Sequence, residues 1–144
     1  MRKFEFVSPA YVDELRRQLA DALATKDLRG TEFCLSEEYT NPPKHLLKPG
    51  KSSIGFHIRL SRGEFEVKDY PDSNGDMVTV ADYQTVLPFA RHIRGIDSKL
   101  DAEFVELRQR MVAAGKIKTN GGPDLVPPVL REAKLHNKMA AITL

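Results

Sequence analysis

The segment from Ser53 to Ala81 constrains the fold of this chain most, because it alternates apolar and polar residues as strands with one buried face do. In its first run, the apolar residues that share one face are Ile54, Phe56, Ile58 and Leu60. A second run repeats the alternation with Phe65 and Val67, and a third, Met77–Val80, follows a turn-forming stretch at residues 72–76. We therefore expect three consecutive antiparallel strands, whose apolar face the rest of the chain must cover.

Arg62 and Gly63 separate the first two of these strands and suit a two-residue hairpin turn. The register that such a turn imposes pairs Leu60 with Phe65, Ile58 with Val67, and Arg59 with Glu66. The last pair brings opposite charges together on the polar face, which favours this register. The alternative is a three-residue loop with a bulge at Gly63, which would break all three pairings.

The composition is that of an ordinary globular domain, since 41% of the 144 residues are hydrophobic and 29% are charged. The 22 basic and 20 acidic residues are mixed along the chain, so no basic stripe indicates binding to nucleic acid. No apolar run reaches the length of a membrane span, and the first residues lack the apolar core of a signal peptide. Cys34 is the only cysteine, which excludes a disulfide within the chain, and we expect a cytoplasmic protein.

Outside this segment, the pattern predicts helices and short strands. The stretch from Thr31 to Ser36 predicts an edge or first strand, and the proline-rich stretch from Glu37 to Gly50 predicts a long loop. The remaining expected elements are a helix from Ser8 to about Lys26, a helix after Asp82 with a kink or break at Pro88, a helix from about Asp101 to Gly115, a short strand at Lys116–Thr119 and a last helix from about Pro128. This order indicates a single α+β domain over residues 1–144, with a mainly antiparallel five-stranded sheet covered on one face by about four helices.

This order and several strings resemble the sterol-carrier-protein-like family of small lipid-binding domains. GFHIRLSRGEFEV resembles the family's first long hairpin, and DMVTVADYQTVLPFARHI resembles its next strand and helix. GKIKTNGGPDL resembles its short late strand, and the leading amphipathic helix is in the expected place. Together these likenesses cover the chain from Ser8 to about Ala133. The resemblance implies a tunnel or cavity between sheet and helices that holds an apolar ligand.

Such a cavity would be lined by the apolar faces of the sheet and the helices. The ligand-binding residues that we expect are Phe56, Ile58, Phe65, Val86, Phe89, Phe104, Leu107 and Met111. The same residues would also make an ordinary hydrophobic core, because pockets and cores are both mostly apolar. Only a void between the two layers distinguishes these alternatives.

Two groups of polar residues are candidates for directed chemistry. His57 and Arg59 lie on the polar face of the first hairpin, where a histidine transfers protons and an arginine holds an anion; the alternative is a solvated face or a dimer surface. Tyr39 and His45 lie in the proline-rich loop, which is longer than in the family, and His45 is the strongest single candidate. Cys34 precedes this loop, and we expect a buried structural thiol rather than a nucleophile.

The sequence contains no pattern for a cofactor or a metal. Residues 72–76 begin like a calcium loop, but the glycine comes one position early and Tyr83 stands where the bidentate glutamate belongs. The four histidines, at positions 45, 57, 92 and 136, lack metal-ligand spacing. A phosphate-binding loop and a dinucleotide-binding motif are also missing. We therefore expect neither a cofactor nor a metal.

Three hypotheses for the function follow. The first is binding and transfer of a hydrophobic small molecule, such as a fatty-acyl or steroid ligand, and a homodimer is compatible with it. The second is a small cofactor-independent lyase, isomerase or hydratase that acts on a hydrophobic substrate with His45 and Tyr39, or with His57 and Arg59. The third is a dimerising module that uses the charged face of the sheet.

Overall fold

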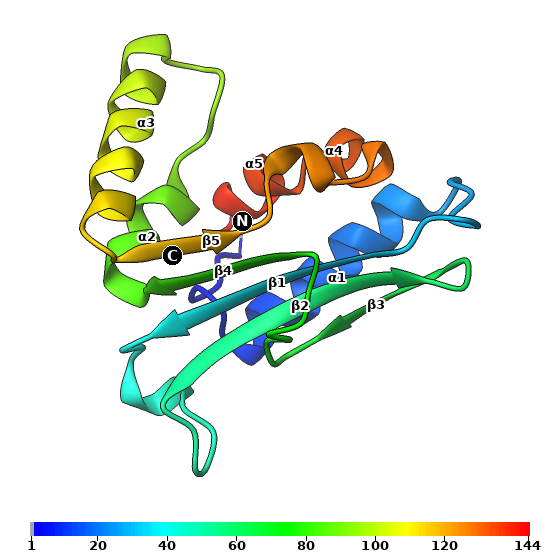
Figure 1. The fold of residues 1–144 in the computed structure, drawn as a ribbon, viewed down its shortest axis with the longest axis horizontal. Helices are drawn as coiled ribbons and strands as arrows, with labels where there is room; N and C mark the ends of the chain where they lie inside the picture. The colour runs from blue at the N-terminus through cyan, green and yellow to red at the C-terminus, as the bar shows by residue number, and fades with distance from the viewer. Residues whose placement is uncertain (1) are drawn as a thin grey trace.

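The structure, a computed structural model, describes residues 2–144. The helices are α1 (Pro9–Leu23), α2 (Tyr83–Arg91), α3 (Ser98–Ala113), α4 (Pro128–Ala133) and α5 (Leu135–Ala140), with short 3₁₀ turns η1 (Lys44–Leu46) and η2 (Pro123–Leu125). The strands are β1 (Phe33–Thr40), β2 (Ser53–Ser61), β3 (Glu64–Lys68), β4 (Met77–Asp82) and β5 (Ile117–Asn120). The strands form one sheet, and the helices lie on one side of it (Figure 1). The predicted α+β fold, with its mainly antiparallel five-stranded sheet, is confirmed.

β1 is the central strand of this sheet, whose strand order is β3-β2-β1-β4-β5. It pairs antiparallel with β2 and parallel with β4. The expectation of three consecutive antiparallel strands is therefore wrong for the third strand, because β4 lies beyond β1 rather than beside β3. β1 is also longer than the sequence indicated. Glu37 and Glu38 interrupt its apolar pattern, and the loop predicted from residue 37 onward is therefore wrong for residues 37–40: pairing with strands on both sides keeps them extended.

The hairpin between β2 and β3 has the predicted register. Leu60 pairs with Phe65, Ile58 with Val67, and Arg59 with Glu66. Both turn residues have positive φ angles, 56° for Arg62 and 77° for Gly63. Such angles are those of a two-residue turn whose twist matches the strands, so the bulged alternative is excluded.

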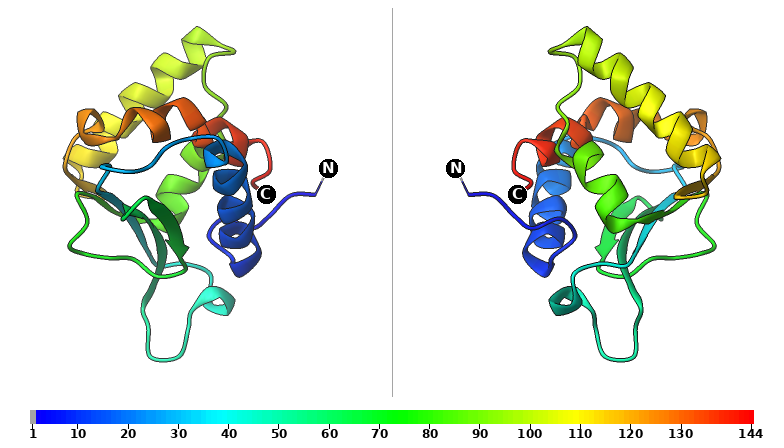
Figure 2. Two further views of the ribbon diagram at one scale, coloured as in Figure 1. Left: turned by 90° about the vertical axis from the view of Figure 1, so that its right-hand side faces the viewer. Right: turned by 90° about the vertical axis from the view of Figure 1, so that its left-hand side faces the viewer.

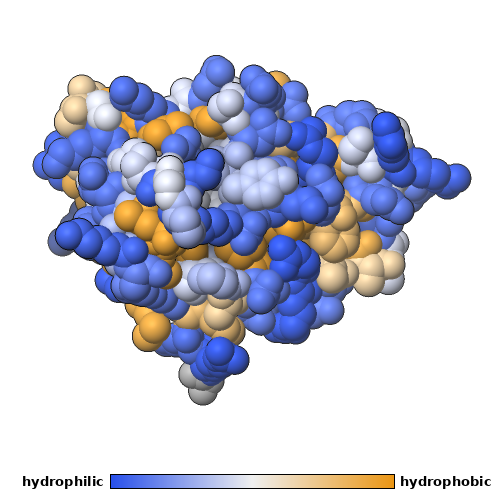
Figure 3. All heavy atoms as spheres, turned by 90° about the horizontal axis from the view of Figure 1, so that it is seen from below, coloured by the Kyte–Doolittle hydropathy of each residue, from blue (hydrophilic) through white to orange (hydrophobic). Residues whose placement is uncertain are grey.

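The connection between β3 and β4 crosses the sheet face that points away from the helices. The ring nitrogen Nδ1 of His57 donates to the carbonyl oxygen of Tyr70 at 2.7 Å. The backbone N–H of Asp72 donates to Oγ of Ser36 at 2.8 Å, and the Asp72 carboxylate pairs with Arg59. These polar side chains of β1 and β2 thus anchor the crossover that the parallel pairing of β4 requires. Seen from below Figure 1, the surface is mostly hydrophilic, with apolar residues in patches (Figure 3).

α1 is the helix that packs along the sheet, and it begins as predicted. Oγ of Ser8 accepts a hydrogen bond from the backbone N–H of Tyr11 at 3.1 Å, which caps the helix. The helix ends at Leu23, slightly before the predicted end near Lys26. Its buried residues recur at helical spacing and face the sheet; they are Tyr11, Val12, Leu15, Leu19 and Leu23.

The other helices agree with the sequence except at the C-terminal end. Asp82 caps α2 as predicted, and Pro88 lies inside this helix without ending it. Gly115, with φ of 76°, follows α3. The single last helix that the pattern predicted is divided into α4 and α5, because Lys134 adopts a left-handed conformation with φ of 51°. The division turns α5 so that it crosses above the sheet (Figure 1).

The two ends of the described chain lie beside each other (Figure 2). The backbone N–H of Phe4 donates to the carbonyl of Ile142 at 2.7 Å, and the N–H of Leu144 donates to the carbonyl of Phe4 at 2.8 Å. Next along the chain, the ring of Phe6 contacts three tyrosines in the core, at centroid distances of 4.9 to 5.5 Å. The N-terminal segment therefore closes the core at one end of α1.

Candidate functional site

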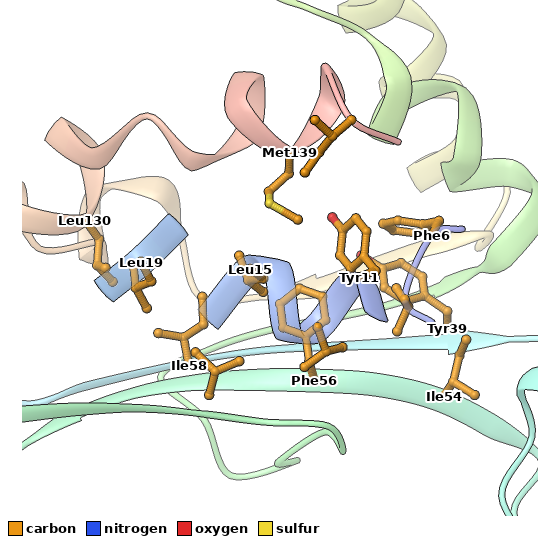
Figure 4. Packing of buried hydrophobic residues seen from close by; sticks show 14 of the residues in the cluster. Phe6, Tyr11, Leu15, Leu19, Tyr39, Ile54, Phe56, Ile58, Leu130 and Met139 are labelled. Atoms are coloured by element: carbon orange, nitrogen blue, oxygen red, sulfur yellow. The ribbon is translucent and has the colours of Figure 1, made fainter. Parts of the chain in front are cut away.

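A cavity of about 350 Å³ lies between the sheet and the helices. Its walls come from β1, β2, β4 and β5 on one side and from α1, α2, α3 and α5 on the other. Figure 4 shows side chains of both layers pointing toward one another, with Phe56 and Ile58 below and Met139 above. The walls are mostly apolar, and the cavity lies where two closely packed layers would leave no space.

The structure brings half of the expected ligand-binding residues to this cavity. Those that line it are Phe56, Ile58, Val86 and Phe89. Phe65 lies beside a shallow depression at the outer edge of β3, and Met111 packs against the core. Phe104 and Leu107 border a separate surface depression along α3, and Phe104 also stacks on the ring of His92 at 4.2 Å. Contact of these eight residues with a ligand stays a prediction.

Glu37 brings a carboxyl group to the wall of the cavity. Glu37 lies on β1 and shares with Leu35 and Tyr39 the face that points to the helices. Its side chain is surrounded by protein and lines the cavity. Burial raises the pKa of Glu37, because a desolvated carboxylate is costly. The hydroxyl of Tyr39 donates a hydrogen bond to Oε1 of Glu37, which acts in the opposite direction. The pair is a titratable group in an otherwise apolar space.

Tyr11 adds a hydroxyl to the same space. The residue is 6% exposed and lines the cavity, and we find no hydrogen bond from its hydroxyl to another group within residues 2–144. In this part of the chain every fully enclosed polar side-chain atom has a partner, so the Tyr11 oxygen must be open to the cavity. Burial raises the pKa of Tyr11, and the charge of Glu37 raises it further. The phenol therefore stays protonated, close to the carboxyl group and able to donate a hydrogen bond.

Arg94 and Arg108 line the cavity and are exposed, so they mark its opening to solvent. Arg94 lies between α2 and α3, while Arg108 lies on α3 and donates to Oγ1 of Thr119 at 3.2 Å. The ion pairs found within residues 2–144 involve neither arginine. Partial burial, and then the charge of Arg108, lower the pKa of Arg94. Because two like charges stand close together, an anionic group at the opening would be stabilised.

His136 borders the cavity beside these arginines. Its Nε2 lies 2.8 Å from the carbonyl oxygen of His92, and a carbonyl only accepts, so Nε2 carries the proton and Nδ1 is left as an acceptor. Burial, followed by the charge of Arg94, lowers the pKa of His136. The ring is therefore neutral around neutral pH.

Of the four residues proposed for catalysis, Tyr39 lies in the cavity. His45 is exposed on η1 and pairs with Glu5, with 2.7 Å between Nε2 and Oε1. His57 and Arg59 lie on the opposite face of the sheet, as predicted, where they anchor the crossover. The structure thus does not bring the four residues together.

Cys34 is buried on β1, on the face away from the cavity. Burial raises the pKa of its thiol, which keeps the sulfur protonated and unreactive. This supports the expected structural role. Within residues 2–144, no group of acidic, histidine or cysteine side chains is arranged to hold a metal ion.

Glu37, Tyr11, Arg94 and Arg108 were not recognised in the sequence as site residues. The sequence does contain a signal for Glu37. In an extended strand every second residue points to the same face, and Glu37 is the charged residue in the series Phe33, Leu35, Glu37 and Tyr39. The two consecutive glutamates at positions 37 and 38 break the apolar alternation, so the pattern alone predicts a loop there. For Arg94 and Arg108 we find no local signal, because they come to one opening only when α3 packs beside β5.

Comparisons with known proteins concern the fold. No family model matches the chain, and no curated protein matches it. Solved structures that resemble it include a UbiJ-SCP2 ubiquinone synthesis protein, at 15% identity and a TM-score of 0.44, over 95% of this chain and 96% of the other. A conserved hypothetical protein of Thermus thermophilus, suggested to be a sterol carrier protein, aligns at 16% identity and a TM-score of 0.47, over 97% and 90% of the two chains.

A third solved structure, sterol carrier protein domain 2 of Helicoverpa armigera, aligns at 11% identity and a TM-score of 0.47, over 97% of this chain and 95% of the other.

Proposed function

We propose that this protein binds a hydrophobic small molecule, such as a fatty-acyl or steroid compound, in the cavity between sheet and helices. The observation that carries the proposal is the mostly apolar cavity of about 350 Å³ between the sheet and the helices. Its volume falls in the lower part of the range of about 300–1,000 Å³ that is usual for ligand pockets. An empty apolar void destabilises a fold, so a ligand that fills it gains contacts that the protein alone lacks.

The polar groups of the cavity favour an amphipathic ligand. Arg94 and Arg108 stand at the opening without a carboxylate partner among the described residues, so an anionic head group is suited to that end. The apolar body would then extend between β1, β2 and α5. Transfer of the ligand between membranes or proteins is a further part of this proposal. Within residues 2–144, no helix is both long enough and apolar enough to cross a bilayer.

A matched pair of variants tests the cavity as the binding site. Ala90 lies on α2 and lines the cavity, whereas Ala102 is exposed on α3. Ala90→Phe should fill part of the void and weaken binding of a fluorescent fatty acid by about tenfold or more, which corresponds to about 1.4 kcal/mol. Ala102→Phe should leave the affinity unchanged.

The assay is a fluorescence titration with both variants, preceded by native mass spectrometry and denaturing extraction of the purified protein. A stoichiometric fatty acid, acyl compound or steroid in the extract would support the proposal. Equal affinity of the two variants for the fluorescent fatty acid would place the binding site elsewhere.

A small cofactor-independent enzyme acting on a hydrophobic substrate is the second candidate function. The observation that favours it is the carboxyl group of Glu37 inside the cavity, hydrogen-bonded to Tyr39. Tyr39 belongs to the residues that the sequence proposed for proton transfer.

A further inference from the structure

Glu37 occupies a position at which the fold has no need of a carboxyl group. The other residues of β1 that face the helices are Phe33, Leu35 and Tyr39. A leucine or methionine at position 37 would continue this surface and fill part of the void. Transfer of a carboxyl group from water to such a place is unfavourable, and one hydrogen bond from Tyr39 offsets part of that cost. The position of Glu37 is therefore explained better by chemistry than by folding.

Tyr11 is a second and independent observation at the same place. Its side chain is more than nine-tenths buried and lines the cavity, and its hydroxyl, open to the cavity, makes no hydrogen bond within residues 2–144. Buried tyrosines usually hydrogen-bond through that hydroxyl; Tyr83, for example, donates to the carbonyl of Phe6 at 2.7 Å. The Tyr11 hydroxyl can thus donate a hydrogen bond to a molecule that enters the cavity.

We propose that Glu37 is the catalytic base of a proton-transfer reaction in this cavity, and that its substrate is a small hydrophobic carbonyl compound whose carbonyl oxygen accepts a hydrogen bond from Tyr11. The inference rests on the proposed function, because it requires that the cavity admit a hydrophobic molecule. It adds the reaction class, an isomerisation by movement of one proton between carbons, and it assigns both side chains.

The reaction balances without a co-reactant. For a β,γ-unsaturated ketone, the Glu37 carboxylate takes the proton from the carbon between the carbonyl and the double bond. The electron pair of that C–H bond forms a carbon–carbon double bond, and the carbonyl π electrons move onto the oxygen, where the Tyr11 hydroxyl stabilises the dienolate. The protonated Glu37 then gives the same proton to the γ carbon, and the C=O bond re-forms. The product is the conjugated ketone, and Glu37 returns to the carboxylate.

The surroundings of Glu37 suit both halves of this cycle. Burial raises the pKa of Glu37, which makes its carboxylate a stronger base than an exposed carboxylate is. Tyr39 acts as a positioning residue, since its hydrogen bond holds Oε1 and leaves the second carboxyl oxygen free. The mostly apolar walls limit the access of water to the intermediate.

The experiment uses the full chain and a ten-carbon β,γ-unsaturated methyl ketone as the probe. Its conversion to the conjugated ketone is followed by ultraviolet absorbance, and its binding is measured separately by displacement of a fluorescent fatty acid. Glu37→Gln should keep binding and lose about 100-fold or more in rate, as expected when a general base is removed. Tyr11→Phe should lose about 100-fold while binding changes little.

Two further variants separate chemistry from structure. Glu38→Gln changes the neighbouring glutamate, which points to the other face of the sheet and bonds Oγ of Ser53, and it should keep the full rate. Tyr39→Phe removes the hydrogen bond that lowers the pKa of Glu37, so the basic plateau of the pH–rate profile should begin at higher pH. If Tyr39 had only a structural role, Tyr39→Phe would change the rate without shifting the pH at which the plateau begins.

The outcomes distinguish this inference from the proposed function. If the probe binds but wild type and Glu37→Gln convert it equally slowly, the catalytic assignment is overturned and the binding function stands. If neither the ketone nor the fluorescent fatty acid binds, both fail together. A rate that depends on Glu37 but is unchanged in Tyr11→Phe would overturn the role of Tyr11.

Discussion

Replacing Glu37 by glutamine should remove a pH-dependent loss of stability that the wild-type protein shows. Burial raises the pKa of Glu37 in the folded protein above its ordinary value of 4.5. Between these two values, the folded protein binds more protons than the unfolded chain does. The free energy of unfolding therefore decreases as pH rises through this window, and the stability conferred by the protonated group is lost above the folded-state pKa.

The magnitude follows from the same linkage. Each unit by which the pKa of Glu37 is raised lowers the free energy of unfolding at high pH by about 1.4 kcal/mol, relative to its value at low pH. The hydrogen bond from Tyr39 stabilises the carboxylate and limits this loss. This pH dependence is opposite in sign to that of carboxyl groups that pair with arginine. Arg29, for example, lowers the pKa of Asp27.

The measurement is urea unfolding, followed by circular dichroism, at several values from about pH 4 to about pH 8. Other groups titrate in this range, so the quantity to compare is the difference between each variant and the wild type. For Glu37→Gln this difference should grow in favour of the variant as pH rises. Glu38→Gln, the matched control on the opposite face, should give no such trend. Parallel curves for wild type and Glu37→Gln would refute the reasoning, because they would mean that water solvates the carboxyl group.

Two further predictions concern the strands that hold Glu37 in place. Gly55 on β2 lies against β1, and a Cβ atom there would overlap the carbonyl oxygen of Glu37. Gly55→Ala should therefore lower the free energy of unfolding, measured with urea, by about 1–3 kcal/mol or more. An unchanged free energy of unfolding would contradict the strand pairing. Ser36 is fully buried and accepts the N–H of Asp72 at 2.8 Å. Ser36→Ala should cost about 1–3 kcal/mol and speed hydrogen exchange at the Asp72 amide, while ligand affinity stays unchanged; weakened binding would mean that the crossover affects the cavity.

The local parts of the fold were predictable from the sequence. Arg62 and Gly63 specify their turn, and the strict alternation around them specifies the register. Ser8 and Asp82 mark two helix starts through side-chain hydrogen bonds to nearby backbone groups. In each case, residues a few positions apart determine the structure, so the pattern contains the information.

The position of β4 could not be predicted in this way. A short loop of turn-forming residues after β3 is compatible with a return beside β3. The chain instead crosses β2 and β1, so that β4 pairs with the far edge of β1. What stabilises the crossover is a set of distant contacts, such as Ser36 with Asp72 and His57 with Tyr70. The opening of the cavity likewise depends on contacts between distant parts of the chain. Arg94 and Arg108 come together only when α3 packs beside β5, so the local sequence does not predict them.

The two faces of the sheet use their polar side chains differently, and this contrast is the strongest argument for a function of Glu37. On the face away from the helices, Ser36, His57 and Arg59 each have a partner in the crossover, so their presence is explained by the fold. On the cavity face, Glu37 has one partner on its own strand, and the Tyr11 hydroxyl has none within residues 2–144. Because folding explains the first set and leaves the second unexplained, variants of the first set should lower stability, whereas variants of the second should slow the reaction without lowering stability. A Tyr11→Phe variant with wild-type stability and altered chemistry would demonstrate this division.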